Sequence, residues 1–242
     1  MKERGALKDQ TAAVPSFLAK AVWSALGTVL DPELDEPLTD LGFVSECTVE
    51  DGRARIRLRL PTYFCAPNFA FLMVADAYDA VSAVPGITGV DVRLRDHFAA
   101  GAINKGVARR AGFVASFEGE AVNELDSLRA EFLRRAVLAG TDRVCRSLRT
   151  DPVTLAGMTL GDVPPGKELD RLKDRRRELG LSHSDSAPLL VDPATDEPIR
   201  AANLTRHLGL ARVTRVSQEA NSGVCRGMLA ARYHESTKED TP

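Results

Sequence analysis

The chain has 242 residues, a formal net charge of −2 and a hydrophobic fraction of 44%, all ordinary values for a soluble globular protein. This length allows one large domain or two modest ones, and the near-neutral charge gives no general reason to expect nucleic acid or membrane partners. No apolar run approaches the roughly 20 residues of a membrane span. Residues 1–10 are charged and lack the apolar core of a signal peptide. We therefore expect a cytoplasmic protein.

The chain begins with a pattern of one helix followed by a hairpin. Apolar residues spaced three or four apart predict a helix over residues 14–29, which ends at Asp31-Pro32 because proline disfavours helical geometry in the residue before it. Residues 43–49 and 53–60 alternate between apolar and polar side chains, and Asp51-Gly52 between them is a strong hairpin signal. An antiparallel pair with one buried face is therefore predicted.

A second helix and a third strand complete this part of the chain. Apolar spacing predicts the helix over residues 67–84 and the strand over residues 90–94, which would return beside the hairpin through a right-handed crossover. The predicted fold class is α+β: an α-β-β-α-β domain over residues 1–96 with a three-stranded mixed sheet, followed by a mainly helical C-terminal module with short strands.

After residue 96 the composition changes. We expect a connector or loose helix over residues 97–118, a mainly helical module of unknown role over 119–235, and a tail over 236–242. Gly140-Thr141-Asp142 is predicted to break a long helix that spans residues 120–148, and the run Arg175-Arg176-Arg177 is predicted to lie exposed and ion-paired on a charged helix. The remaining predicted elements are short strands over 153–163, 189–191 and 213–216, and helices over 167–179, around Leu204 and Leu208, and over 224–233.

The four cysteines are far apart and form no CxxC pair, which disfavours a zinc ribbon. Cys47, Cys145 and Cys225 each fall on an apolar stripe, so burial as a small hydrophobic side chain is a sufficient explanation for each. Cys65 is the exception, because it lies in a loop two residues before Pro67, which is well placed at the first turn of a helix. Backbone N–H groups and the helix dipole there favour a thiolate.

A thiolate in this position could bind a soft metal or a cluster, or attack an electrophile. Asp31 and Glu33 flank a proline where the first helix ends, and on spacing alone we expect a helix-to-loop junction in which Asp31 caps nearby amides. Taken together with Cys65, the two carboxylates could instead support the thiol or act as hard ligands for iron.

Residues 20–95 resemble the small iron–sulfur assembly factor family that includes the SufT-type and PaaD-type proteins. The features that match are the helix before Asp31-Pro32-Glu33, the segment Leu41-Gly42-Phe43-Val44 that begins a strand, the hairpin, and Pro61-Thr62-Tyr63 leading to a cysteine and a proline. In the family the cysteine is immediately followed by proline, whereas Ala66 stands between Cys65 and Pro67 here. The cysteine-rich C-terminal tail of PaaD-type members has no counterpart in this chain.

The resemblance implies a factor for maturation of iron–sulfur or other iron cofactors, acting as a carrier or adaptor and not as an enzyme. Its partners would be the assembly machinery and a client metalloenzyme such as an oxygenase. Cys65 would be the functional thiol and metal ligand, with Asp31, Glu33 and Thr62 completing a cofactor-binding site for a transient iron–sulfur cluster or iron. Because one protein thiolate cannot complete a cluster site, a bridged homodimer or a site shared with a partner is expected.

Two other hypotheses stay open. In the first, the chain is a thiol enzyme that uses Cys65 as its nucleophile, with His97 as base because it is the only histidine of the N-terminal module. In the second, the α/β domain is a protein-interaction module without a cofactor, and the Cys65-Ala66-Pro67 order leaves this open.

The C-terminal half offers weaker signals. A metal site drawn from His97, His183, His207 and Cys225 together with Cys145 is conceivable, but no ligand spacing supports it. Residues 199–233 hold six arginines against the single acid Glu219, a stretch that could grip an acidic client surface or RNA. A solvated face is the commoner explanation, and no aromatic interleaving supports binding of a single strand.

Overall fold

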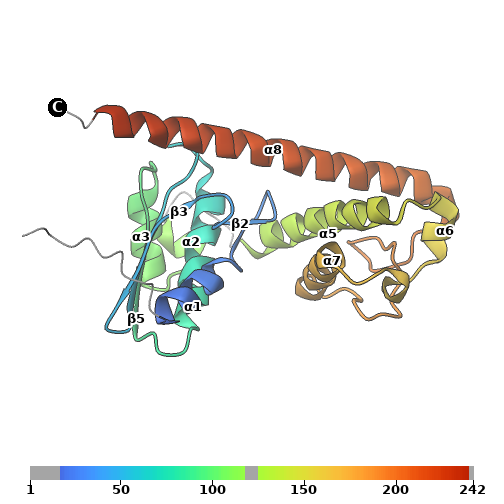
Figure 1. Cartoon of the computed structure of the whole chain (residues 1–242), viewed down its shortest axis with the longest axis horizontal. Helices are drawn as coiled ribbons and strands as arrows, with labels where there is room; N and C mark the ends of the chain where they lie inside the picture. The colour runs from blue at the N-terminus through green and yellow to red at the C-terminus, as the bar shows by residue number, and fades with distance from the viewer. Residues whose placement is uncertain (1–16, 118–124, 240–242) are drawn as a thin grey trace, which may run out of the picture.

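The computed structural model describes residues 17–117 and 125–239, which form two packed modules joined by one long helix (Figure 1). The N-terminal module contains the sheet, and the C-terminal module is built from helices and loops. Each module has its own hydrophobic core. The long helix, α8 (Leu204–Glu239), runs along both modules.

The sheet has the predicted topology. Strands β3 (Val44–Glu50) and β4 (Arg53–Leu58) pair antiparallel, and β5 (Gly89–Leu94) pairs parallel with β4, so the order is β3-β4-β5. The turn between β3 and β4 has φ values of 49° at Asp51 and 73° at Gly52, which suits a two-residue hairpin loop with both central residues at positive φ. The mixed sheet and the α+β fold class are confirmed.

Two helices cover the sheet as the apolar spacing predicted. They are α1 (Phe17–Leu26) and α2 (Pro67–Ser82), whose apolar faces join the inward side chains of β4 in one core. Between α1 and β3 the chain makes the short pair β1 (Leu30–Asp31) and β2 (Glu36–Pro37). The Asp31-Pro32-Glu33 segment therefore sits in a tight hairpin at the edge of this module.

The segment expected to connect the two modules is folded. It contains α3 (Ala100–Ala108) and α4 (Phe113–Ser116), and Ile103 of α3 is fully buried in the N-terminal core. The Asn104 side chain accepts from the Leu94 N–H at 2.8 Å and donates to the Leu94 carbonyl at 3.0 Å, which ties α3 to the end of β5. The N-terminal core thus extends beyond residue 96.

Helix α5 (Asp126–Leu148) is continuous, so the break predicted at Gly140-Thr141-Asp142 is wrong. Contacts with other helices explain why. Gly140 packs beside Leu172 of α7 (Lys167–Glu178), and buried Asp142 accepts from Arg215 of α8. Gly140 and Asp142 favour a turn in isolation, but here both lie where α5 contacts other helices.

Replacing Gly140 by alanine is expected to raise the free energy of unfolding by about 0.5–1 kcal/mol, because alanine loses less backbone entropy in a helix. There is room for the methyl group, since a Cβ at this position would lie 3.4 Å from Leu172 Cδ1. Urea denaturation measures the change. Gly106→Ala is the contrasting variant and should lose stability, because its Cβ would lie 1.9 Å from Ser116 Oγ. A loss at Gly140 of the size seen at Gly106 would contradict the packing of α5 on α7.

Three segments predicted as short strands are not strands. Residues 153–163 hold most of α6 (Pro152–Gly157) and the 3₁₀ turn η1 (Leu160–Asp162), because Asp151 caps the amides of Val153 and Thr154 and starts a helix. Residues 189–191 take part only in isolated bridges, and residues 213–216 lie inside α8. Runs rich in valine and leucine follow the surrounding structure and not their intrinsic preference.

Helix α7 ends as predicted, with Gly180 at a φ of 76°, but its arginine run is only partly exposed. Arg177 pairs with Asp174 on the surface as expected. Arg176, predicted to be exposed, is fully buried and donates to the carbonyls of Pro188 at 2.8 Å and Leu189 at 2.6 Å. The Arg176 guanidinium thus supplies hydrogen-bond donors for two backbone carbonyls of the loop that contains Pro188 and Leu189.

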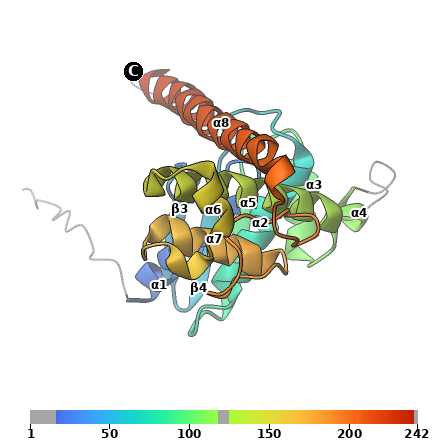
Figure 2. The same ribbon diagram turned by 90° about the vertical axis from the view of Figure 1, so that its right-hand side faces the viewer.

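Helix α8 is a single element, where the sequence predicted a helix, a strand and another helix. It begins with Leu204 in the C-terminal core, lies beside α5, and reaches the N-terminal core with Leu229 (Figures 1 and 2). The short 3₁₀ turn η2 (Ala201–Asn203) precedes it. Across the described ranges, no helix combines the length and apolarity needed to cross a membrane.

Candidate functional site

The loop that carries Cys65 lies between the end of β4 and α2. Thr62 Oγ1 is 3.2 Å from Cys65 Sγ and accepts from the Phe64 N–H at 3.2 Å, so the threonine shapes the loop and contacts the thiol. Helix α2 begins at Pro67, with Ala66 at its N-cap and no side chain capping it. Cys65 is half-buried and forms no disulfide, and it lies at the helix start where the sequence predicted it.

The His97 side chain forms hydrogen bonds with the backbone on both sides of its ring, one of them to the Cys65 loop. The Ala99 N–H donates to Nδ1 at 3.1 Å, which places the proton on Nε2, and Nε2 donates to the Cys65 carbonyl at 2.7 Å. Burial lowers the pKa of His97, and the positive charge of Arg232 lowers it further, so the ring stays neutral near pH 7. Both ring nitrogens bond to the backbone, and neither is free to take a proton from the thiol.

Asp31 lies within the β1–β2 hairpin and is only 8% exposed. Its Oδ1 accepts from the N–H groups of Glu33 and Leu34, both at 2.9 Å. Burial raises the pKa of Asp31 to about 6; the two amide bonds oppose this shift, and the charges of Glu33 and Glu36 add to it. A buried carboxylate that titrates near neutrality costs stability, and such groups cluster at functional sites.

Glu33 is tied to α8. Its side chain accepts from Asn221 at 3.4 Å and its carbonyl from Gln218 at 3.3 Å. The next turn of α8 presents Cys225, whose pKa rises to about 11 because of burial first, and then because of the negative charges of Asp31, Cys65 and Glu33. Asn221 and Gln218 thus fix this part of α8 against the β1–β2 hairpin.

Cys225 was predicted to be a core residue, and it is half-buried and packs against the N-terminal core. The four-residue spacing Asn221–Cys225–Leu229 puts an amide, a thiol and a leucine on one face of α8. That face could not be assigned to the Asp31–Pro67 stretch from sequence, because Cys225 lies 160 positions after Cys65.

An exposed aromatic patch borders the thiol loop. Tyr63, Phe64 and Phe98 are 48%, 76% and 49% exposed, and their ring centroids lie 5.0 to 6.4 Å apart. His97 stacks on Phe98 at 4.9 Å and so links the patch to the Cys65 carbonyl. Clustered exposed aromatic side chains are typical of protein-binding surfaces. The sequence reasoning did not single out this patch.

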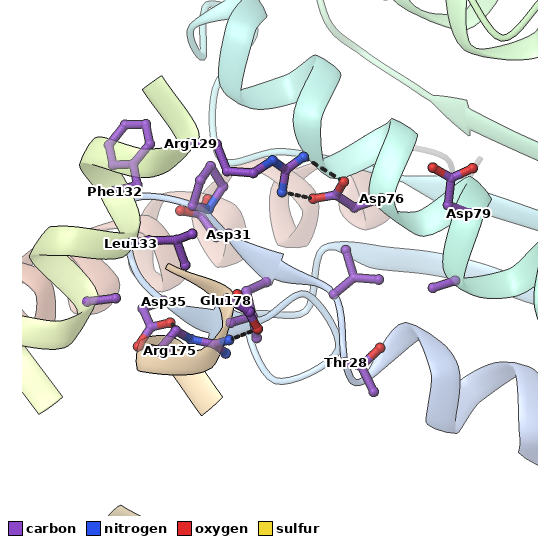
Figure 3. A pocket seen from close by; sticks show the side chains of 15 residues that line it. Thr28, Asp31, Asp35, Asp76, Asp79, Arg129, Phe132, Leu133, Arg175 and Glu178 are labelled. Atoms are coloured by element: carbon purple, nitrogen blue, oxygen red, sulfur yellow. Dashed lines mark hydrogen bonds and ion pairs between the residues drawn. The ribbon is translucent and has the colours of Figure 1, made fainter. Parts of the chain in front are cut away.

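A cavity of about 310 Å³ lies where the two modules meet (Figure 3). Arg129 of α5 crosses it to both oxygens of Asp76 at 2.8 Å, and Arg175 of α7 pairs with Glu178 and Asp35. Asp31 also lines the cavity, whereas Cys65 and Thr62 do not. Because its carboxylates have arginine or amide partners, this cavity is a junction of ion pairs between modules.

Asp35 is the centre of that junction. It is 4% exposed, and its carboxylate contacts Arg171 Nε at 3.0 Å and Arg175 Nε at 2.7 Å, with Arg143 at 4.0 Å. The three arginines come from α5 and α7, so one carboxylate of the N-terminal module holds charges from two helices of the other. Its backbone φ is 54°, a left-handed value that aspartate tolerates better than most residues.

The described part of the chain contains no group of three or more histidine, cysteine, aspartate or glutamate side chains arranged to hold a metal ion. The predicted site contains one thiol, Cys65, whereas a four-cysteine cluster needs four such ligands. The residues thus fit an incomplete cluster site that needs ligands from elsewhere. The metal-binding role of Cys65 stays a prediction.

The fold and this loop define a small α/β domain that presents a cysteine thiol at the start of a helix. A family model described as an iron–sulfur cluster assembly protein matches residues 19–93, from α1 to β5. Residues 19–93 are therefore a domain of the iron–sulfur cluster assembly family, as the sequence resemblance predicted. The match is compatible with the SufT-type and PaaD-type proteins and stops before α3. No curated protein matches the chain.

Proposed function

We propose that this protein is a non-enzymatic maturation factor that carries an iron–sulfur cluster, or iron, as cargo and delivers it to a client metalloenzyme such as an oxygenase. The observation that carries the proposal is the match of residues 19–93 to the assembly family together with the position of Cys65. The thiol is half-buried, has Thr62 as its hydrogen-bonding partner, and stands at the N-terminus of α2. In this proposal Cys65 is the metal ligand, and Asp31, Glu33 and Thr62 support it.

The surroundings of Cys65 suit transfer to another protein. The aromatic patch of Tyr63, Phe64 and Phe98 would dock the client or the assembly machinery next to the thiol. The C-terminal module would select the client, since it rests on the N-terminal domain through α8 and the Asp35 junction. The missing ligands would come from a second copy of the chain or from the client.

The environment of Cys65 favours a carrier over a thiol enzyme. A nucleophilic cysteine needs a base within hydrogen-bonding reach, and both nitrogens of His97 are occupied by backbone groups. The proposal also places the protein in the cytoplasm, because cluster assembly needs unpaired thiols and a reducing compartment keeps them so. All four cysteines are free here.

Anaerobic reconstitution with ferrous iron and sulfide tests the proposal. The wild-type protein is expected to gain cluster absorbance and bound iron, and Cys65→Ser is expected to lose at least nine-tenths of both, because a serine hydroxyl is a poor ligand for iron in a cluster. Cys47→Ser is the matched control, since Cys47 is half-buried on β3 and lies outside the loop. An unchanged spectrum in Cys65→Ser would remove the role assigned to this thiol.

A further inference from the structure

Helix α8 has one side against both modules and one side that faces away from them (Figures 1 and 2). Its buried residues recur at helical spacing and mark the inner side: Leu204, His207, Ala211, Thr214, Arg215, Gln218, Ser222 and Leu229. The middle of the outer side is exposed and holds valine, alanine and glycine: Gly209, Val213, Val216, Ala220, Gly223, Val224, Gly227, Ala230 and Ala231. The exposed charges of this stretch, Arg212 and Glu219, lie on one flank. A helix side that faces solvent normally carries polar residues along its middle, so this side lacks a partner.

The large apolar side chains of the outer side are strongly exposed. Leu210, Val213, Val216, Val224 and Met228 are each between 44% and 66% exposed. Residues 209–231 form a strip about 34 Å long and about 10 Å wide, or about 340 Å², from the rise and diameter of an α-helix. Continuous apolar patches of a few hundred Å² are commonly interaction sites.

Three glycines on the outer side have no explanation within the described chain. Gly209, Gly223 and Gly227 lie inside the helix, where glycine is destabilising relative to alanine. A Cβ added at any of the three would meet no atom within 4 Å, so no packing contact requires their small size. The distance between two packed helices depends on the side chains at their contact. Glycines on an exposed side therefore suit a second helix that approaches closely.

The spacing of the outer side is symmetric about Ala220. Val216 and Val224 lie four residues before and after it, and Val213 and Gly227 lie seven residues before and after it. A two-fold axis through Ala220 would therefore bring an antiparallel copy of α8 into register, with Val216 against Val224 and Val213 against Gly227. Steps of three and four residues are those of coiled-coil contacts, and a large residue against a small one lets the two surfaces interdigitate.

One flank fits the same pairing. Leu210 and Met228 are eighteen residues apart, which is five helical turns, so they lie on the same flank. They stand ten residues before and eight residues after Ala220, and each would meet the other across the two-fold axis. An uncharged surface offers a charged client nothing to pair with, whereas a copy of itself meets no like-charge repulsion. A second copy of this chain is thus the partner that fits.

We propose that the outer side of α8 is a dimer interface, on which α8 of a second copy packs antiparallel with Ala220 at the two-fold axis. Arg232 lies twelve residues after Ala220 and donates to the carbonyls of Leu60 and Asp96, which flank the Cys65 loop and His97. The two Cys65 loops would therefore lie at opposite ends of the helix pair, roughly 36 Å apart along its axis. The dimer does not depend on the proposed function, but one consequence rests on it: a cluster could not bridge the two Cys65 thiols, so its remaining ligands would come from the client.

Sedimentation velocity of the full-length protein tests the dimer. The wild-type protein is expected to be a dimer at micromolar concentration, and Val216→Glu and Val224→Glu should each weaken the dimer at least 100-fold, because every dimer would bury two unpaired carboxylates. Val153→Glu is the matched control, since Val153 is an exposed valine on α6 and should leave the dimer intact. Circular dichroism checks that the variants keep their helices. A wild-type monomer at 100 µM, or a dimer that survives both α8 variants, would overturn the interface.

Disulfide cross-linking tests the orientation. Two Cα atoms must come within about 7 Å to be bridged, so Ala220→Cys should give linked dimers on oxidation by air with a copper catalyst. Val213→Cys should not, because two copies of residue 213 would lie about 21 Å apart along an antiparallel pair. Wild-type protein treated in the same way gives the background from the four native cysteines. Equal linking of Val213→Cys and Ala220→Cys would overturn the antiparallel arrangement.

The two proposals fail separately, because neither measurement of the dimer uses iron. A wild-type dimer that gains no cluster from iron and sulfide would support the α8 interface and remove the proposed function. A wild-type monomer that gains the cluster through Cys65 would support the proposed function and overturn the α8 interface.

Discussion

Asp35→Asn is expected to lower the free energy of unfolding by about 3–5 kcal/mol, the cost of removing one partner from a buried ion pair. The side chain is 4% exposed and contacts Arg171 and Arg175, with Arg143 4.0 Å away. Asparagine keeps the shape and tolerates the φ of 54°, so the change isolates the charge. Without the carboxylate, three partly buried guanidinium groups would repel one another where the modules meet.

Urea denaturation and limited proteolysis measure this effect. Because each module has its own core, Asp35→Asn should also cleave faster at the junction than within either module. Asp40→Asn is the matched control, since Asp40 lies in the same region but is exposed and should change stability by less than about 0.5 kcal/mol. Equal unfolding curves for Asp35→Asn and Asp40→Asn would show that the Asp35 junction does not join the modules.

Asp31→Asn is expected to have the opposite effect and to stabilise the protein at pH 8, by at most about 3 kcal/mol. The pKa of Asp31 rises from 3.8 to about 6 on folding, chiefly through burial. A raised folded-state pKa contributes stability that is present below pH 3.8 and is lost as the pH rises through about 6. Asparagine carries no charge and keeps an oxygen for the Glu33 and Leu34 amides, so it avoids this loss.

The pH dependence distinguishes this explanation from a general packing effect. The stability difference between Asp31→Asn and the wild type should vanish at pH 4 and below, grow through pH 6, and stay constant above pH 7. Thermal unfolding over this range measures it. If Asp31 supports the thiol site, the variant should also bind less iron after reconstitution, so that stability rises while function falls. A stability gain that is the same at every pH would rule out the buried charge as its cause.

Local patterns were enough to predict the N-terminal domain. Alternation in residues 43–60, the Asp51-Gly52 turn and the apolar spacing of residues 67–84 are short-range signals, and α2, the hairpin and the mixed sheet all follow from them. The C-terminal module was harder, because its elements depend on contacts between distant residues. In sequence, Gly140 predicts a helix break, but in the structure it packs beside Leu172 within a continuous helix. The valines of residues 213–216 predict a strand, but in the structure they lie inside α8.

Part of the candidate site could be predicted from sequence as well. Cys65 stands before Pro67 at a helix start, and Thr62 contacts it, because both are fixed by a loop of a few residues. That loop with the family match to residues 19–93 is what the sequence by itself determined about function. Only the tertiary structure decided that α8 packs on the N-terminal domain, with Asn221 bonded to Glu33, and that Asp35 joins the modules. Such groupings depend on where a distant helix packs, and its stability comes mostly from that packing and not from local propensity.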